Sequence, residues 1–466
     1  MSAPPPRPSS DPAPTATPDK LKTWRVGTLT YTKGELAVLF SWLLWGDFAW
    51  AIRDRSVTTV LQLMLRKFEV TDTVAGLLVG TLPASIGLIL GPIVSYQSDR
   101  HRGPRGRRIP YLFFSAPLAA ISIVGLGLSP VIGQILHHAL GAHSPGYFPS
   151  VVLVLALWWA VFDFATTITN AVFVALINDV VPAAVIGRFY GLFRAVSLLV
   201  GIGFNYWLLG KAEAHYLWIF IAVGAIYGLG VVSMCLKVRE GDYPPPPPAH
   251  GKNGTAAFFR AAKIYFKECF THPYYLWFFA AFNLAMLAST PVNLFSVFFA
   301  KSLNMSMDTY GGYIAAMYVI SLTLTWVLGS LADRFHPLRV GMVSIGLYCL
   351  ATLCGGFFAT TPATFGLALL AHGVLGGAYF TGAAALGQRL LPHATFAQFM
   401  SASGIVGGVL NIITPWIVGR ALDLSHHNYR LTYFFSSGVA FVALGCLAMV
   451  HRHWRRLGGD TNYTPP

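Results

Sequence analysis

The chain has 466 residues, of which 55% are hydrophobic and only 11% are charged, and its formal net charge is +14 at pH 7. Soluble domains carry about 25% charged residues, so this composition excludes a water-soluble globular protein. The positive residues fall into separate loops between apolar runs. They do not form one basic face, so we expect no nucleic-acid partner.

Apolar runs along the chain reach the roughly 20 residues that an α-helix needs to cross the hydrocarbon core of a bilayer. A membrane β-barrel would instead show alternating segments of about 10 residues. We therefore predict an all-α membrane protein embedded in the lipid bilayer. The runs between Gly, Pro and charge clusters predict twelve transmembrane helices, at residues 35–63, 72–97, 111–136, 150–177, 187–209, 214–236, 275–299, 309–331, 337–358, 363–388, 398–420 and 431–451.

The stretch before the first predicted span begins MSAPPPRPSS and lacks the short apolar core and cleavage site of a signal peptide. We predict a disordered cytoplasmic tail over residues 1–33. Most Lys and Arg residues fall on this tail and on loops of the same side, so the positive-inside rule predicts a multi-pass protein of the cell inner (plasma) membrane with both termini cytoplasmic. The five cysteines show no metal-ligand spacing, and we expect them to be inert.

The longest polar connection lies between the sixth and seventh predicted spans and contains the run Pro244 to Pro248. Its later part, Phe258 to Phe270, mixes aromatic and basic residues, as in a helix on an anionic membrane surface; a solvated linker helix fits equally well. The chain then divides into an N-terminal six-helix bundle, a cytoplasmic linker, a C-terminal six-helix bundle and a cytoplasmic tail, at residues 34–236, 237–273, 274–452 and 453–466.

An internal repeat links the two halves, because Ser95-Tyr-Gln-Ser-Asp99-Arg100 after the second span recurs as Gly329-Ser-Leu-Ala-Asp333-Arg334 after the eighth. This motif resembles the G-x-x-x-D-R loop of the major facilitator superfamily, with Ser95 in place of the first glycine. The resemblance implies the major facilitator fold, with two six-helix bundles around a central site. Carboxylates at these helix ends can pair with arginines or with helix N-termini of the neighbouring repeat, which predicts a gating latch. Charge that only sets topology is the alternative. The gating candidates are Asp99, Arg100, Arg107, Arg108, Asp179, Asp333 and Arg334.

Two stretches carry a more specific resemblance. Ser98-Asp99-Arg100 and then Gly106-Arg107-Arg108-Ile109-Pro110-Tyr111 resemble the loop of the sucrose transporter and glycoside-pentoside-hexuronide cation symporter group. Asp163 with Thr166-Thr167, and Asp179 sixteen residues after Asp163, are similar to a pattern of the sucrose carriers. This resemblance implies that Asp163 is the proton-coupling carboxylate and that the substrate is a sugar. Val174 stands where the sucrose carriers have an arginine, so the resemblance does not extend to sucrose itself.

The residues of the fourth span support a functional role for Asp163 independently. Asp163 interrupts an apolar helix near mid-depth, where a charge costs about 2.5 to 3.5 kcal/mol or more unless it faces water, a partner or a proton. Its carboxylate can take up a proton on one side and release it on the other as hydration changes. Thr166, Thr167 and Asn170 follow at helical spacing and offer polar groups to a substrate. A structural hydrogen bond from Asp163 to a neighbouring helix is the alternative.

The first span carries more charge than a lipid-facing helix tolerates, at Asp47, Arg53, Asp54 and Arg55. Asp47, Trp50 and Asp54 share one helical stripe, which suits bonding to hydroxyl groups and stacking on a sugar ring. We predict substrate binding by Asp47, Trp50, Arg53, Asp54, Thr167 and Asn170. A salt-bridge network that only packs this span is the alternative.

Two further ionisable residues fall within predicted spans. Arg194 lies near the start of the fifth span and is a further candidate for the central cavity. Snorkelling of its long side chain to the inner membrane surface is the alternative, and we favour it slightly. His372 is placed inside the tenth span, whereas most other histidines fall in loops or tails, where a solvated role is usual.

These features favour a secondary active transporter for proton-coupled uptake of a sugar or glycoside by alternating access, with sodium as the other possible coupling ion. A carrier of another small solute, such as an organic anion held by Arg53 or Arg55, is one alternative, and a non-transporting receptor or assembly factor on the same fold is another. We expect a monomer without a cofactor or metal. An enzyme is not expected, because the sequence lacks a P-loop, an H-E-x-x-H motif and a nucleophile–base pair.

Overall fold

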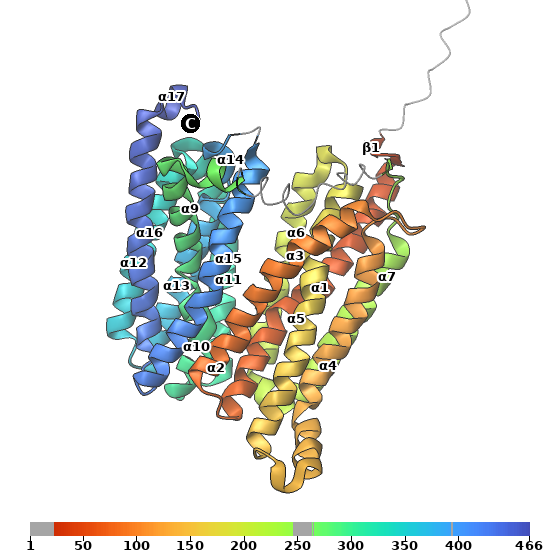
Figure 1. Ribbon diagram of the computed structural model, residues 1–466, viewed down its shortest axis with the longest axis vertical. Helices are drawn as coiled ribbons and strands as arrows, with labels where there is room; N and C mark the ends of the chain where they lie inside the picture. Colours follow the sequence, from red (N-terminus) through yellow and green to blue (C-terminus); the bar gives the residue numbers. More distant parts are fainter. Residues whose placement is uncertain (1–22, 246–262, 264, 393–394) are drawn as a thin grey trace, which may run out of the picture.

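The computed structural model describes residues 23–245, 263, 265–392 and 395–466, and its long helices form two bundles that lie side by side (Figure 1). The N-terminal half contains β1 Trp24–Val26, β2 Leu29–Tyr31, α1 Lys33–Lys67, α2 Asp72–Gly76, η1 Leu77–Thr81, α3 Leu82–Arg100, α4 Ile109–Leu140, η2 Gly141–His143, α5 Tyr147–Val180, α6 Ala183–Gly203, η3 Phe204–Leu208, η4 Leu209–Lys211 and α7 Ala212–Lys237. The C-terminal half contains α9 Pro273–Leu287, α10 Thr290–Ser302, α11 Met307–Phe335, α12 Pro337–Phe358, α13 Pro362–Gly382, α14 Leu386–Leu390, α15 Phe396–Leu424, α16 Arg430–Arg456 and α17 Gly459–Asn462.

Ten helical stretches in the described part of the chain are long and apolar enough to cross a membrane. One of them, residues 183–237, would be roughly 80 Å long as a straight helix, far beyond the roughly 30 Å of the hydrocarbon core. It turns back around η4 and the non-helical backbone of His215, so α6 and α7 cross separately. Helix α11, with 29 residues, supplies one more crossing. The predicted all-α membrane protein with two six-helix bundles is confirmed.

Side-chain caps define where several of these helices begin. At α1, the Glu35 N–H donates to Thr32 Oγ1 (3.4 Å) and the Thr32 N–H donates to Glu35 Oε2 (2.8 Å). The hydroxyl groups of Thr71, Ser306 and Thr361 accept N–H groups at the starts of α2, α11 and α13. The first N–H groups of a helix have no partner within it, so these caps stabilise helix ends that the apolar pattern alone locates only coarsely.

The hydrophobic cores show where the two bundles are joined. One continuous core fills the N-terminal bundle and extends into the C-terminal bundle through Phe295, Phe299, Phe365 and Tyr433. A second core fills the other end of the C-terminal bundle, around Trp454. We call the end of the molecule that carries the β-hairpin and α17 the termini side and the opposite end the loop side (Figure 1). The bundles therefore share a core at the loop side and have separate cores at the termini side.

Part of the predicted disordered tail is ordered. Strands β1 and β2 form an antiparallel hairpin, with Gly27 at φ 54° in the turn. The Asp242 N–H donates to Thr28 Oγ1 (2.9 Å), so the hairpin contacts the segment that follows α7. The prediction of disorder is wrong for residues 23–33, because apolar residues that alternate around a glycine turn favour a hairpin. Residues 1–22 lie outside the described part of the chain.

The surface helix predicted at residues 258–270 lies partly outside the described residues. Within this range, the structure describes residue 263 and residues 265–270, which are helical. The last residues of the chain, predicted as a cytoplasmic tail, dock on the C-terminal bundle. The Tyr463 hydroxyl donates to the Leu390 carbonyl (2.6 Å) and lies 2.7 Å from the Tyr274 hydroxyl oxygen. The chain end therefore covers the termini side of α9 and α14.

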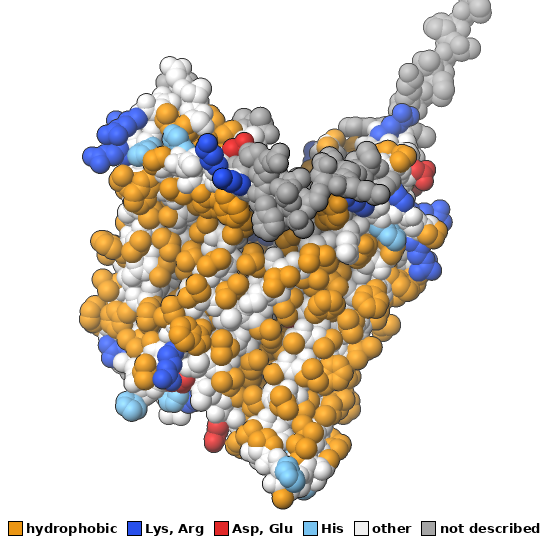
Figure 2. All heavy atoms as spheres, in the orientation of Figure 1, with side chains coloured by type: hydrophobic (Ala, Val, Ile, Leu, Met, Phe, Trp, Pro, Cys, Tyr) orange, Lys and Arg blue, Asp and Glu red, His pale blue; other side chains and the backbone are white. Residues whose placement is uncertain are grey.

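The outer surface of the bundles matches a bilayer. In Figure 2, hydrophobic side chains cover the middle of the face shown, and Lys and Arg side chains gather toward its two ends. Large apolar side chains are exposed on several helices, including Ile121, Leu157, Leu229, Leu350 and Phe441. Exposed apolar side chains in such numbers are stable only against lipid, so the polar groups within the bundles have to find partners inside the protein.

Candidate functional site

A cavity of about 770 Å³ lies between the bundles, walled by α1 and α3 on one side and by α10 and α15 on the other. Its volume lies within the roughly 300 to 1,000 Å³ that is typical of small-molecule sites. Small and apolar residues make up much of the wall, and hydroxyl and amide groups project among them. The polar members are Thr58, Gln62, Thr290, Asn293, Ser401 and Asn411.

Close backbone packing seals the bundles against each other on the loop side of this cavity. A Cβ atom added to Gly76 would lie 2.4 Å from the Pro415 carbonyl oxygen, and one added to Gly80 would lie 2.4 Å from the Pro415 ring. The Thr81 hydroxyl donates to the Ile412 carbonyl (2.7 Å), and the Gln62 side-chain amide donates to the Leu294 carbonyl (3.2 Å). Any larger side chain at either glycine would force the bundles apart, so only glycine permits this closure.

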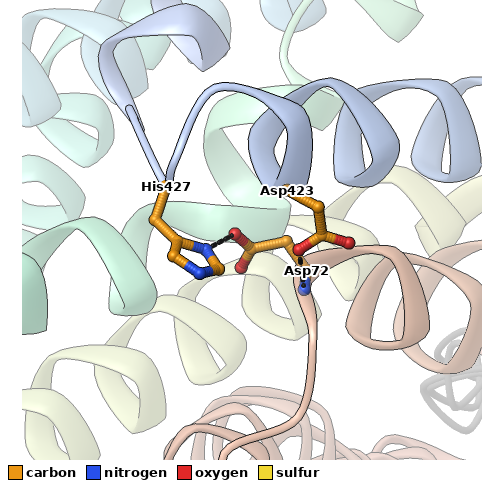
Figure 3. A group of neighbouring side chains, drawn as sticks. All are labelled: Asp72, Asp423 and His427. Atoms are coloured by element: carbon orange, nitrogen blue, oxygen red, sulfur yellow. Dashed lines mark hydrogen bonds and ion pairs between the residues drawn. The ribbon is translucent and has the colours of Figure 1, made fainter.

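A polar cluster reinforces the seal at the loop-side surface (Figure 3). We call Asp72, Asp423, His427 and Tyr429 the Asp72 clasp. The Asp72 carboxylate is fully buried; its Oδ2 lies 2.6 Å from His427 Nδ1, and its Oδ1 accepts a hydrogen bond from the Tyr429 hydroxyl (2.9 Å). In return, the Asp423 carboxylate accepts the N–H groups of Asp72 and Thr73 (both 2.9 Å). The clasp thus joins α2 of one bundle to α15 and α16 of the other.

The same cluster contains a possible ligand set for a metal ion. Asp72, Asp423 and His427 each offer one ligand atom, and these atoms lie within 4.8 Å of one another. In the structure, however, both Asp423 oxygens already accept hydrogen bonds at the start of α2. The separation of 2.6 Å between His427 and Asp72 is that of a direct hydrogen bond. The geometry therefore favours a hydrogen-bonded link over a metal centre.

The N-terminal bundle buries a second group of charges, close to the middle of α1 and α5. Asp47 is fully buried, Asp163 is 9% exposed and Arg53 is 5% exposed. Both carboxylate oxygens of Asp47 and the Oδ2 atom of Asp163 have no hydrogen-bond partner among the described residues. A buried carboxylate without a partner is costly when ionised, so the carboxyl groups of Asp47 and Asp163 are suited to holding a proton.

Arg53 is enclosed by aromatic rings and one amide. Its guanidinium carbon lies 5.2 Å from the centre of the Trp50 ring and 5.4 Å from that of Tyr227. Its Nη2 donates to Asn170 Oδ1 (3.1 Å), which also accepts the Trp50 indole N–H (2.8 Å). These contacts bring together three of the residues predicted to bind substrate, namely Trp50, Arg53 and Asn170. Of the three, Asn170 is exposed.

The other predicted binding residues lie apart from this trio. Asp47 is enclosed within the bundle and does not reach the cavity surface, because α6 and α7 pack along α1. Asp54 is exposed, and its Oδ1 lies 3.9 Å from Arg53 Nη1. Thr167 is half-buried on α5, and Val174, which replaces the arginine of the sucrose carriers, is 48% exposed. The predicted stripe of Asp47 with Trp50 and Asp54 thus divides into a buried and an exposed part.

The predicted gating residues Arg107, Arg108, Asp99 and Asp179 form one network at the termini side. Arg107 donates to both Asp179 oxygens (3.0 and 2.6 Å), and Arg108 donates to Asp179 (3.0 Å) and pairs with Asp99. The N–H groups of residues 107 to 109 all donate to the Glu240 carboxylate, at 2.7 to 2.9 Å. We call this set, with Glu240, the arginine clamp. Its members belong to the N-terminal bundle and to the segment directly after α7.

Tyr243 completes the outer edge of the clamp. Its hydroxyl donates to Glu240 Oε2 (2.8 Å), and its ring lies 4.1 Å from the Arg107 guanidinium carbon. Burial raises the pKa of Tyr243 above its usual value, and the neighbouring Glu240 carboxylate raises it further. The phenol therefore remains a hydrogen-bond donor at any physiological pH.

The remaining gating candidates lie outside the arginine clamp. The Arg100 guanidinium stacks on Tyr96 (4.1 Å), and the Arg334 guanidinium lies over Phe335 (5.3 Å). Asp333 lies in α11, and its side chain is outside the described part of the structure. The N-terminal copy of the repeat is therefore built into the clamp through Asp99.

A network in the C-terminal bundle was not predicted, although His372 was placed in a span. His372 is 2% exposed; its Nδ1 lies 2.9 Å from the Tyr348 hydroxyl and its Nε2 lies 3.0 Å from Asn293 Oδ1. Tyr348 also donates to the Ala288 carbonyl (3.1 Å), at the break between α9 and α10. Since Asn293 lines the cavity, His372 fixes the orientation of a cavity amide from behind. Only the isolated histidine in an apolar run hinted at this network.

Comparisons with known proteins agree with this architecture. The family model described as Major Facilitator Superfamily matches residues 39–415 and 278–458. A bacterial homolog of the human lysosomal transporter Spinster, solved in an inward-facing and unoccupied conformation, is similar over 94% of this chain and 100% of its own, with 16% identity and a TM-score of 0.63. A mutant of the nucleoside transporter NupG is similar over 89% of this chain and 99% of its own, with 12% identity and a TM-score of 0.65. The inward open xylose transporter XylE from E. coli is similar over 89% of this chain and 96% of its own, with 13% identity and a TM-score of 0.63. At such identities the likeness shows the fold alone.

Glu240→Gln tests the arginine clamp. The neutral amide accepts the three N–H groups less strongly than the carboxylate, and hydrogen bonds to charged groups contribute about 1.5 to 3 kcal/mol each. We expect a lower thermal unfolding midpoint for the purified protein in detergent. Asp242→Asn is the control, because the Asp242 side chain is exposed two residues away. Equal losses in the two variants would contradict the specific role of Glu240.

The Asp72 clasp can be tested by labelling the cavity from the loop side. Gly404→Cys offers a probe site, because no atom lies within 4 Å of an added Cβ there. In a background without the native cysteines, Asp72→Asn and His427→Ala should each speed reaction of the introduced thiol with a membrane-impermeant maleimide supplied at the loop side. His426→Ala is the matched control, since His426 shares the loop and a positive φ with His427 but is not part of the clasp. An unchanged labelling rate in both clasp variants would show that the clasp does not hold this side closed.

Proposed function

This chain belongs to the major facilitator superfamily, and we propose that it is a secondary active transporter that takes up a sugar or glycoside together with protons. That it is a transporter and not an enzyme follows from the family. The coupling ion and the solute are parts of the proposal. The observation that carries it is the buried group of Asp47, Arg53 and Asp163 within the N-terminal bundle.

Asp163 is the proposed proton carrier. It lies next to Arg53, which exerts an attraction on its charge, while one of its oxygens has no partner among the described residues. A carboxylate balanced in this way between burial and a nearby cation changes its proton affinity when water or substrate enters. A shift of Arg53 toward or away from Asp163 would therefore couple protonation to conformation.

The proposed sugar-binding surface is the exposed side of the aromatic cage around Arg53. Trp50 offers an apolar ring face, and Asn170 offers an amide, both of which suit a pyranose ring with its hydroxyl groups. The indole N–H and the guanidinium of Arg53 hold Asn170 Oδ1, which leaves its NH₂ group for substrate. Asn293 on α10 offers a second amide, in the wall of the cavity between the bundles.

Alternating access requires the bundles to rock about this site. The loop side is closed by the glycine–proline contact and by the Asp72 clasp. With the termini side placed in the cytoplasm, as the positive-inside rule predicts, this arrangement corresponds to a conformation closed to the outside. The arginine clamp would move with the N-terminal bundle as one rigid body, and gating by its residues is a further part of the proposal.

Uptake of labelled sugars into proteoliposomes, with and without an inward proton gradient, tests the proposal. Wild type should accumulate one sugar above equilibrium, and Asp163→Asn should lose this accumulation but keep exchange of sugar across the membrane, because the amide cannot carry a proton. Asp460→Asn is the control, since Asp460 is exposed near the C-terminus and pairs with Arg339.

The alternatives give different results in the same assay. Accumulation of a different class of solute, with sugars inert, would support a carrier for that class. Binding without flux of any solute would support a receptor or assembly factor. Accumulation driven by sodium and indifferent to Asp163→Asn would reject this residue as the proton carrier.

A further inference from the structure

A groove with a volume of about 470 Å³ opens on the outer surface of the C-terminal bundle, between α11, α12 and α13. Helix α13 packs against both α11 and α12, which contact each other less. The hollow between α11 and α12 therefore has α13 as its floor. The groove shares no lining residue with the cavity between the bundles, so it is a separate site.

The walls of this groove are largely apolar. Val343 and Leu347 of α12 line it and are 63% and 50% exposed, and Leu331 and Phe335 of α11 line it and are also exposed. Apolar surface of this extent is unfavourable in water and favourable against hydrocarbon. The lining therefore fits an apolar chain.

The groove has the depth of one membrane leaflet. Its mouth lies at the termini side, where α11 ends at Phe335 and α12 begins at Pro337. From this end, the lining extends roughly 12 Å along α12, from Arg339 to Leu347, and roughly 16 Å along α11, from Phe335 to Leu324. Half of the roughly 30 Å hydrocarbon core is about 15 Å. A lipid chain that enters at the mouth would therefore end near the middle of the bilayer.

A cation stands at the mouth, because Arg339 is one of the lining residues there. Its side chain is 44% exposed, and its Nη2 donates to Asp460 Oδ2 (2.7 Å). Its guanidinium carbon lies 5.3 Å from the centre of the Trp454 ring, which is 1% exposed. A fixed aromatic surface thus holds this cation at the groove. Since a guanidinium has five N–H donors in a planar fork, it can bind Asp460 and a phosphate oxygen together.

Further basic side chains lie around Arg339. The centre of the His336 ring lies 4.8 Å from that of Trp454, on the buried side of the mouth. Burial lowers the pKa of His336, and the positive charges of Arg389 and Arg339 lower it further, whereas Asp460 opposes them only in part. The described charges around His336 therefore act as an excess of positive charge.

Helix α16 adds to the same excess. The ring of His451 lies 5.4 Å from that of Trp454, and both Arg339 and Arg455 are close enough to act on it electrostatically. In Figure 2, Lys, Arg and His side chains gather at the termini-side end of the C-terminal bundle. We call Arg339, Arg389, Arg455, His336 and His451 the basic cluster. It lies at the mouth of an apolar groove, and this combination is complementary to a lipid with an anionic headgroup.

We propose that the groove and the basic cluster bind one anionic phospholipid, with an acyl chain between α11 and α12 and the phosphate at Arg339. With the termini side placed in the cytoplasm, as the positive-inside rule predicts, the mouth lies at the headgroups of the inner leaflet. Anionic lipids make that surface negative, and basic pockets between transmembrane helices bind their headgroups. A zwitterionic headgroup carries a cation of its own, which the basic cluster repels.

The first arm of the experiment tests the headgroup. The full-length protein in detergent is titrated with phosphatidylglycerol or with phosphatidylcholine of the same chains, and native mass spectrometry gives the Kd of the first bound lipid. Phosphatidylglycerol should bind about tenfold or more tightly, a difference of about 1.4 kcal/mol. Arg339→Gln should remove this preference, and Arg339→Lys should keep part of it. Arg452→Gln is the matched control, because Arg452 is exposed at the same side of the bundle but does not line the groove.

The second arm tests the groove. Leu347→Trp places a large ring at its deep end, so it should weaken binding of long-chain phosphatidylglycerol about tenfold, or by about 1.4 kcal/mol. Dihexanoyl phosphatidylglycerol should be unaffected, because its short chains do not reach Leu347. Leu350→Trp is the matched control, since Leu350 is 60% exposed on the same helix but does not line the groove.

The outcomes separate a lipid site from a site for free phosphate. Equal affinity of the wild type for the two lipids, or an unchanged preference in Arg339→Gln, would overturn the proposal. Displacement of the lipid by an equal concentration of inorganic phosphate, together with wild-type binding in Leu347→Trp, would assign the basic cluster to free phosphate and overturn the lipid site. If Arg339→Gln does not fold, the wild-type comparison and the pair of Trp variants still decide. None of these results bears on the proposed transport, because the groove and the cavity are separate.

Discussion

The hydrocarbon core of the bilayer offers no water to a charged group, and this constraint shapes the interior of the molecule. Each buried charge has to find a partner, accept or lose a proton, or face a space that water and solutes can enter. Arg53 meets the first demand through Trp50, Tyr227 and Asn170. Asp163 has only partial compensation, because its Oδ2 atom has no hydrogen-bond partner among the described residues. Incomplete compensation at one site is the physical condition for coupling an ion to a conformational change.

The contact between the bundles depends on a different property, the small size of glycine. Gly76 and Gly80 let α2 and η1 approach Pro415 more closely than any other residue would allow. Polar links at the loop-side surface, centred on Asp72, add to this close packing. Van der Waals packing of this kind is lost as soon as the surfaces separate, and hydrogen bonds can be exchanged with water. A seal made of both can therefore open and close without unfolding either bundle.

The two ends of the molecule use charge differently. At the termini side, the arginine clamp ties the α3–α4 loop to α5 and to the segment after α7, through Asp179 and Glu240. At the loop side, Asp72 links the two bundles directly. The first arrangement makes a bundle rigid, and the second holds one bundle against the other. The conformation described here combines both.

Motif spacing and helix geometry predicted several of the residues that the structure brings together. Asp163, Arg107, Arg108 and Asp179 carry family patterns within short segments, and Trp50 with Arg53 lies on one helix turn, where local geometry suffices. Asp72 was overlooked because its partner His427 is separated from it by more than 350 residues. The sequence left Arg194 between the cavity and the membrane surface, because its distance from the helix end also allows snorkelling. Its contacts with Thr325 and Thr381 of the other bundle favour the cavity, and nothing local reveals these two threonines.

By itself, the sequence determined that this protein lies in a lipid bilayer, the number and approximate position of its helices, and their division into two related halves. These properties follow from composition and from hydrophobic runs, because each helix satisfies its own backbone and needs only length and apolarity to span lipid. The tertiary structure decided which charges meet. Those pairings depend on how helices from distant parts of the chain rotate and pack, and a rotation of one residue, about 100°, moves a side chain such as Asp47 from a cavity to a sealed core.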